Sequence, residues 1–171
     1  MSIIEEILTS KVKPKEKVTL LAKELEGNKK LITDLIAYFK TASTAEKGAS
    51  IEAIEYITAK NPKFAGSCLD FIVAQINGDE PRVKWEACRI IANISKEFPD
   101  ETANAIPRLI INTKDDGTVV RWSAASALTK IAINNPKTQK KLLPIFSELV
   151  KKEKNSGVKN VYIKALKILG K

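Results

Sequence analysis

The sequence lacks residues that most enzyme active sites need. It has no histidine in 171 residues, and histidine is the commonest general base and metal ligand. It also has no Gly-Lys-Ser or Gly-Lys-Thr phosphate loop, no dinucleotide-binding glycine pattern and no Gly-x-Ser-x-Gly turn. These absences argue against catalysis, and we expect a protein that is not an enzyme and carries no cofactor.

Cysteine and long apolar runs are scarce too. Cys68 and Cys88 are the only cysteines, each among apolar residues, so we expect buried free thiols and no four-ligand zinc site. No apolar run approaches the roughly 18 residues of a transmembrane helix. Residues 1–13 carry acids inside their apolar run and lack a basic start, which indicates an amphipathic helix and not a signal peptide. We therefore expect a cytoplasmic protein.

What the sequence does contain is a repeat. The segment 83–91 returns 37 residues later as 120–128, and Pro62, Pro99 and Pro136 keep the same step. A fixed period of this length is typical of a solenoid built from helix pairs. We predict an all-α, right-handed α-α superhelix of about four helix pairs, with a leading helix near residues 2–10 and a last unpaired helix. We expect one domain over residues 1–171, with units 15–41, 45–78, 82–115 and 119–154 and a half-repeat at 158–170.

Apolar spacing assigns the helices within each unit. Val83, Ala87 and Ile91 recur at helical spacing, and so do the equivalent residues of 120–131. The periodic prolines fall between the two helices of a pair, where proline should stop the first helix and open the turn to the second. Pro107 and Pro144 fall inside the second helices and should bend them or lie near their starts.

The motif Val-Arg-Trp-Ser-Ala-Ala-Ser-Ala-Leu at 120–128, with Asp116 four residues ahead, resembles the HEAT and HEAT-like repeat family of armadillo-type α-solenoids. Asp79 with Val83 and Lys84 is a second match. The resemblance implies a binding and scaffolding role and no catalytic residues. It also implies a structural ladder, in which Lys84 and Arg121 pair with the turn aspartates Asp79 and Asp116.

Trp85 and Trp122 are the only tryptophans and occupy equivalent positions. They lie off the centre of the apolar stripe, so we expect them to be partly exposed and stacked side by side. Exposed aromatic pairs are good candidates for the centre of a protein interface, and bases could also stack on them. The alternative is that they only pack between adjacent first helices.

Charge is concentrated at one end of the chain. The net charge is +9, and residues 137–171 contain ten lysines against Glu148 and Glu153, a net +8. Such a distribution suggests an acidic protein surface, nucleic acid or an anionic membrane as partner, although a solvated end face would look the same. The candidate partner-binding cations are Arg108, Lys140, Lys141, Lys151 and Lys152.

Together these patterns favour a non-catalytic scaffold or adaptor. We expect it to bind another macromolecule, namely a protein, on a concave face formed by the second helices of the pairs. The alternative is a nucleic-acid-binding module that uses the basic C-terminal third. A third reading is a HEAT-like DNA glycosylase, a class that relies on tryptophans and an aspartate in a basic groove.

Overall fold

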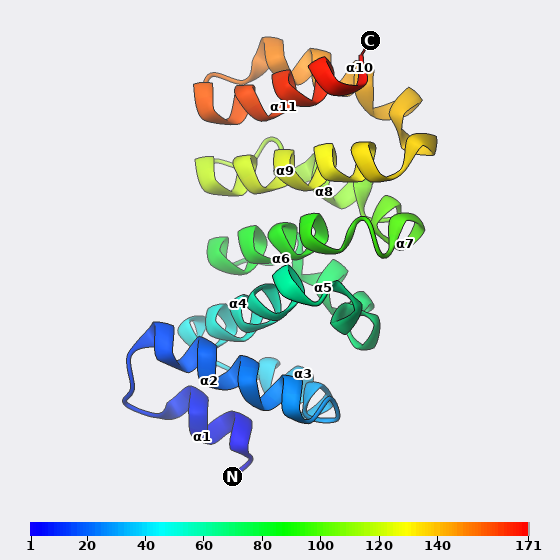
Figure 1. Ribbon diagram of the computed structural model, residues 1–171. Coiled ribbons are helices and arrows are strands. Elements are labelled where there is room, and N and C mark those ends of the chain that lie inside the picture. Colours follow the sequence, from blue (N-terminus) through cyan, green and yellow to red (C-terminus); the bar gives the residue numbers. More distant parts are fainter. Residues whose placement is uncertain (171) are drawn as a thin grey trace.

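The computed structural model describes residues 1–170, which form a curved stack of helices in two layers (Figure 1). The all-α solenoid prediction is confirmed. The short helix α1 (Ile3–Thr9) covers the N-terminal end. The inner layer consists of α2 (Pro14–Gly27), α4 (Thr44–Lys60), α6 (Pro81–Ile94), α9 (Thr118–Asn134) and α11 (Ser156–Leu169). The outer layer consists of α3 (Leu31–Phe39), α5 (Leu69–Gln75), α8 (Ile106–Asn112) and α10 (Gln139–Lys152).

Local sequence explains where the helices begin. Helix α4 starts with a capping box, in which the Ser43 hydroxyl accepts the Glu46 amide and the Glu46 carboxylate accepts the Ser43 amide. The Asn155 side chain caps α11 by accepting from the Val158 amide. Pro14 and Pro81 occupy the first position of α2 and α6, where the missing N–H has no intrahelical partner to lose.

The periodic prolines do more than end the preceding helix. Each one begins a short helix that leads into the outer layer, namely η1 (Pro62–Ser67), α7 (Pro99–Ala103) and η2 (Pro136–Thr138). The inner helices end before these prolines, as predicted, and the connection to the outer layer is itself a short helix. Proline has the φ that a first helical residue needs, so it both stops one helix and starts the next.

The core runs along the stack between the two layers. Ile54, Ile91 and Leu128 occupy equivalent positions on α4, α6 and α9, and all three are fully buried. Buried alanines such as Ala87 and Ala124 keep the inner helices close together, and each inner helix packs on the next one along the row. The outer helices contact the inner helices more extensively than they contact each other.

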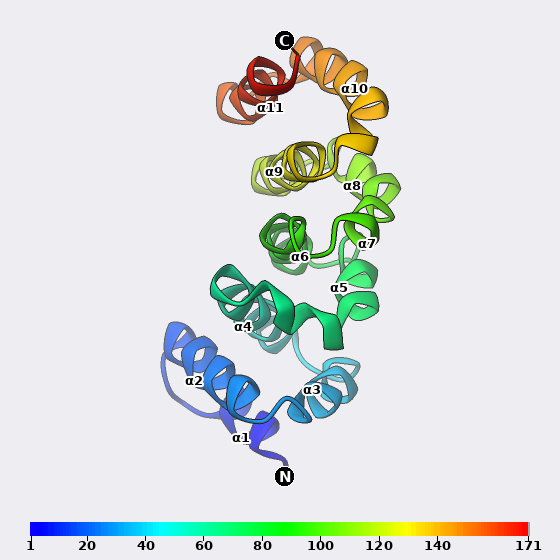
Figure 2. The same cartoon turned by 45° about the vertical axis from the view of Figure 1, so that its right-hand side comes forward.

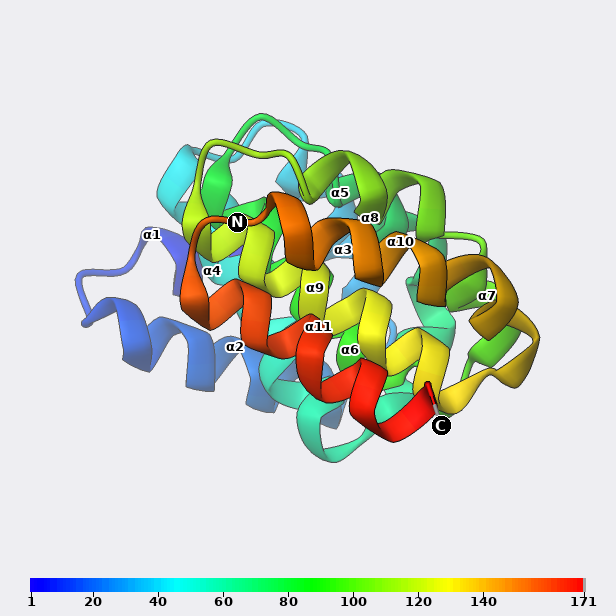
Figure 3. The same ribbon diagram turned by 90° about the horizontal axis from the view of Figure 1, so that it is seen from above.

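Successive inner helices lie closer together than successive outer helices, and this difference curves the stack. Figure 2 shows the row α2, α4, α6, α9 and α11 lining the concave side and the outer row lying on the convex side. Seen along the stack in Figure 3, α5, α8 and α10 lie on one side and α6, α9 and α11 on the other. The prediction that the second helices of the pairs form the concave face is wrong. The alanine-rich first helices pack more closely, so their side of the stack is the shorter arc.

Two outer-layer junctions, one repeat apart, are built differently. Between α5 and α8, the Asn77 amide donates to the Arg108 carbonyl at 2.9 Å and to Asn112 Oδ1 at 2.8 Å. The Asn112 amide donates to the Ile76 carbonyl at 2.7 Å. We call Asn77 and Asn112 the asparagine clamp. One period on, the equivalent residues are Lys114 and Leu149, which make no such link between α8 and α10.

Candidate functional site

The concave face carries an exposed stripe on α9. Val119, Trp122, Ser126, Lys130 and Ile133 recur at three- and four-residue spacing, and the Trp122 side chain is 43% exposed. Helices α6 and α11 cover the two flanks of α9 and the outer layer covers its back. The stripe can therefore face only the concave side. It exposes apolar groups and one lysine on that side.

Trp85 lies at the equivalent place on α6 but is only half-exposed. Its indole N–H donates to Glu86 Oε1 at 3.1 Å, which ties the ring to its own helix. The aromatic pairs among residues 1–170 are Phe39 with Phe71 and Phe146 with Tyr162. The predicted stacking of Trp85 on Trp122 is therefore wrong. The hydrogen bond to Glu86 holds the Trp85 ring against its own helix and away from Trp122.

Beneath Trp85 lies a buried carboxylate. Glu86 is 3% exposed; its Oε1 accepts from Trp85 and from Arg89 Nη1 at 3.2 Å, and Arg89 also pairs with Glu55 at 3.3 Å. Glu86 Oε2 has no hydrogen-bond partner within the described chain. Burial raises the pKa of the Glu86 carboxyl, Arg89 opposes this, and the carboxylates of Glu55 and Glu52 raise it further. The Oγ of Ser123, one repeat later, is likewise buried without a partner in residues 1–170.

The charge of the concave face changes along the stack. Helix α4 carries Glu52 and Glu55, which pair with Arg82 and Arg89 of α6. Residues 118–134 and 156–169, by contrast, contain no Asp or Glu. On α11 the same row of positions presents Lys164 and Ile168, the latter 64% exposed. The C-terminal half of the face is therefore basic and apolar, without opposing charge of its own.

The other predicted binding cations lie elsewhere. Arg108 is exposed on α8, and Lys140, Lys141, Lys151 and Lys152 are exposed on α10. These helices belong to the convex side (Figure 2), so the structure separates these cations from Trp85 and Trp122. Binding was expected on a concave face formed by the second helices, but these helices form the longer, outer arc, so the cations lie on the convex side. Lys171 lies outside the described residues.

The structural ladder exists with different partners. Lys84 Nζ pairs with Asp115 Oδ2 at 2.8 Å, and Arg121 Nε pairs with Glu153 Oε2 at 3.1 Å. Burial alone would raise the pKa of Asp115, but hydrogen bonds from Lys84 and the Gly117 amide, with the nearby positive charges, lower it.

Asp79 and Asp116 make no ion pair within residues 1–170, so their predicted role in the ladder is wrong. The basic side chains reach forward to the turn that follows the next outer helix. There Asp115 is held by its bond to the Gly117 amide, and Asp116 contributes its backbone carbonyl to Arg121 at 3.1 Å.

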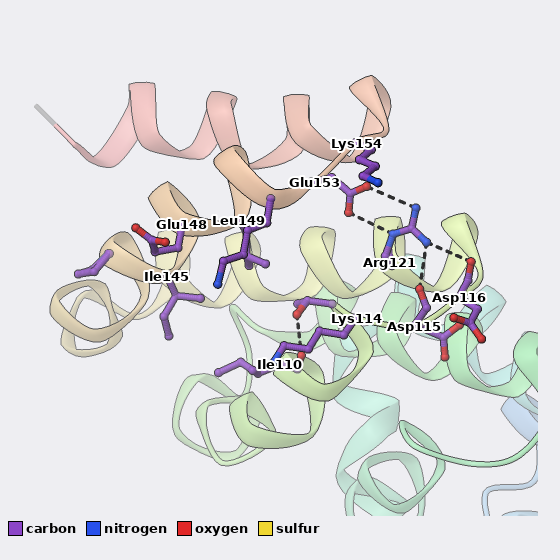
Figure 4. Close-up of a pocket in the computed structure, with 13 residues that line it drawn as sticks. Ile110, Lys114, Asp115, Asp116, Arg121, Ile145, Glu148, Leu149, Glu153 and Lys154 are labelled. Atoms are coloured by element: carbon purple, nitrogen blue, oxygen red, sulfur yellow. Dashed lines mark hydrogen bonds and ion pairs between the residues drawn. The ribbon is translucent and has the colours of Figure 1, made fainter.

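An open cleft of about 650 Å³ lies between α8 and α10. In Figure 4, Ile145 and Leu149 point from α10 toward Ile110 and Lys114 on the α8 side, and the Arg121–Glu153 pair lies at one end. We call this the outer cleft. Sequence reasoning missed it. The signal available was the replacement of Asn77 and Asn112 by Lys114 and Leu149 one period later.

The two cysteines and the metal-ligating residues offer no further site. Cys68 and Cys88 are buried free thiols, as predicted, and burial raises the pKa of Cys68 to about 11 and that of Cys88 to about 12. Thiols this weakly acidic are poor nucleophiles at neutral pH. Across residues 1–170 no group of three or more cysteine, aspartate or glutamate side chains is placed to hold a metal ion. None of the described helices is long and apolar enough to cross a membrane.

Comparison with known proteins identifies the family. The model of HEAT repeats matches residues 69–167, more than half of the chain. The chain belongs to the HEAT repeat family. The match starts at the first residue of α5 and ends within α11.

Individual relatives of this HEAT protein are distant. It is 26% identical over 109 residues to the AP-3 complex subunit delta-1 of Bos taurus, a match that covers 64% of this chain and 9% of that subunit. A designed armadillo repeat protein in complex with the peptide (KR)4 matches with a TM-score of 0.71 at 22% identity, over 95% of this chain and 79% of that one. An engineered protein matches with a TM-score of 0.71 at 22% identity, over 97% and 80% of the two chains. These structures share the fold.

Proposed function

We propose that this HEAT protein is a non-catalytic, cytoplasmic scaffold that binds an acidic segment of a partner protein on the concave face of α6, α9 and α11. The observation that carries the proposal is the composition of that face. It exposes Trp122, Val119 and Ile168 beside Lys130 and Lys164, on two helices that contain no acidic residue. Exposed aromatic and aliphatic groups supply contact area, and uncompensated lysines favour carboxylates.

The relatives support this class of function. AP-3 delta-1 is by its name a subunit of a multi-protein complex. The designed armadillo protein of the same fold holds a peptide of alternating basic residues. The concave face of this chain needs a negatively charged ligand, because its own unpaired side chains are positive. We therefore infer an acidic peptide segment as the ligand.

The distribution of lysines disfavours the nucleic-acid alternative. A groove for a phosphate backbone would gather the basic residues on one surface. Here Lys140, Lys141, Lys151 and Lys152 lie on the outer helix α10, while Lys164 lies on the inner helix α11. Fluorescence anisotropy with a labelled duplex and a labelled single strand should give only weak binding that vanishes near physiological salt. Tight binding that persists there would favour nucleic acid over the protein partner.

A displayed library of random peptides tests the proposal directly. We expect selection against the folded chain to enrich acidic peptides with bulky apolar residues. Replacement of Trp122 by Ala should then weaken the selected peptides by about 2 kcal/mol, or roughly thirtyfold. The matched control is Ile3→Ala, which removes a similarly exposed apolar side chain from the N-terminal end. Peptides that bind equally well to Trp122→Ala would place the site elsewhere.

Charge reversal gives a second test of the same face. Lys130→Glu with Lys164→Glu should weaken the acidic peptides at low salt, since both lysines border the exposed apolar stripe. Lys140→Glu with Lys141→Glu changes the net charge equally on the convex side and should have a much smaller effect. Equal loss in both pairs would show that only overall charge matters.

A further inference from the structure

The outer cleft is an apolar site with a distinct shape. Its volume of about 650 Å³ falls within the range of ligand-binding clefts in proteins. Ile110, Pro144, Ile145 and Leu149 line its walls. A second hollow of about 470 Å³ adjoins it around Ile111, which is 62% exposed. The apolar surface therefore continues from the cleft to the outside of α8.

The cleft lies at the junction where the asparagine clamp is absent. Between α5 and α8, Asn77 and Asn112 join the two outer helices by three hydrogen bonds. Lys114 and Leu149 replace them between α8 and α10. Neither side chain carries an amide, and among residues 1–170 no hydrogen bond joins α8 to α10.

The rim of the outer cleft carries an excess of free positive charge. Lys114, Lys152 and Lys154 line it, and none of them makes an ion pair within residues 1–170. Most carboxylates at the cleft are engaged: Asp115 by Lys84, Glu153 by Arg121 and Glu148 by Lys151. Asp116 is the exception among the described residues. The apolar walls thus lie inside a rim that attracts anions.

We propose that the outer cleft is a second binding site, which takes a short peptide segment with bulky apolar side chains flanked by carboxylates. The apolar side chains would enter between Ile110 and Leu149. The flanking carboxylates would lie against Lys114 and Lys152. A peptide fits better than a compact small molecule because the apolar surface extends past the cleft to Ile111. This site is separate from the concave face and does not depend on it.

The probe is an acetylated, amidated peptide with Leu-Phe between two pairs of glutamates. It is titrated into the full chain labelled at its isoleucine and leucine methyl groups, and followed by NMR. We expect saturable shifts of the Ile110, Ile145 and Leu149 methyls, with a Kd on the order of 1 mM or tighter. The methyls of Ile133 and Ile168 report separately on the concave face. Shifts confined to those two, or no shifts at all, would overturn the proposal.

Two control peptides test the ligand chemistry. A version with Ala-Ala in place of Leu-Phe removes the apolar groups, and a version with lysines in place of the glutamates reverses the charge. We expect both to bind at least about tenfold more weakly. An equal response to the lysine version would refute the acidic class of ligand.

Two sets of variants test the site. Lys114→Glu with Lys152→Glu should reduce binding about tenfold or more, because it reverses the rim charge at exposed positions that leave the core intact. The matched control is Lys140→Glu with Lys141→Glu, on the same outer helix but outside the cleft. The pair Lys114→Asn and Leu149→Asn grafts the asparagine clamp onto this junction and should abolish the methyl shifts. Unchanged binding by the rim variant would contradict the assignment, whether or not the grafted variant folds.

Discussion

The α5–α8 junction and the α8–α10 junction occupy successive repeats, and the inner helices behind them are built alike. Ile91 and Leu128 are equivalent and equally buried. The outer surfaces differ, because the first junction is closed by the asparagine clamp and the second is open to solvent along the outer cleft. The repeat therefore keeps the core that specifies the solenoid and varies the outer layer.

The largest expected effect is the loss of stability on truncating core residues of the inner helices, and it tests whether the core is equally well packed in successive repeats. Ile91→Ala and Leu128→Ala should each lower the free energy of unfolding by ~2–5 kcal/mol, as truncations of fully buried residues do. The two losses should agree within about 1 kcal/mol, since both cavities form in equivalent surroundings. Urea unfolding followed by circular dichroism measures both. A neutral result for either one would contradict its place in the core.

The clamp predicts a smaller and asymmetric effect. Asn112→Leu should lower the free energy of unfolding by about 1–3 kcal/mol, because the buried Ile76 carbonyl loses its donor. The reverse change, Leu149→Asn, lies at the open junction, where water can satisfy the new amide, and should cost less than about 1 kcal/mol. The same unfolding assay compares them. Equal losses in the two variants would mean that Asn112 contributes no more to the free energy of unfolding than Leu149 does.

The smallest effect concerns the buried carboxylate that Ser123 replaces one repeat later. Burial raises the pKa of Glu86 above the ordinary value of a glutamate, 4.5, so its protonated form is favoured in the folded chain. The associated stability is present below that value and is lost as the pH rises through the folded pKa. We expect Glu86→Gln to gain stability relative to the wild type between about pH 4 and about pH 7.

Urea unfolding of both proteins at the two pH values measures this gain. Glu97→Gln serves as the control, because Glu97 is exposed in the turn that follows α6. A gain that is absent, or that the control shows equally, would mean that burial of Glu86 does not perturb its titration.

The architecture could be predicted from the sequence because its cause is local and periodic. The 37-residue step and the apolar stripes of 83–91 and 120–128 depend only on helical spacing, and the structure buries those positions. Which layer is concave depends on how closely successive helices pack. The small residues Ala87 and Ala124 indicate close packing of the inner helices. The periodic apolar pattern by itself, however, does not show toward which layer the stack curves.

The site was less accessible to sequence reasoning because it depends on contacts across repeats. The partners of Lys84 and Arg121 lie about one repeat ahead in the chain, in turns whose geometry is set by Gly117 and by the end of α10. The orientation of Trp85 is set by Glu86, a residue that binary patterning would place outside the core. The outer cleft lies where Lys114 and Leu149 replace the two asparagines of the preceding junction, a change that leaves the helical pattern intact.

The missing clamp also determines where the solenoid bends most easily. In a curved beam, tightening the curve shortens the inner side and lengthens the outer side. Helix α11 packs on α9, so that contact acts as the pivot, while among residues 1–170 no hydrogen bond or ion pair joins α8 to α10. Any motion that narrows the concave face must therefore widen the outer cleft. A ligand that separates α8 from α10 on the convex side would hold the concave face in its more curved form. A ligand that tightens the concave face would in turn open the outer cleft.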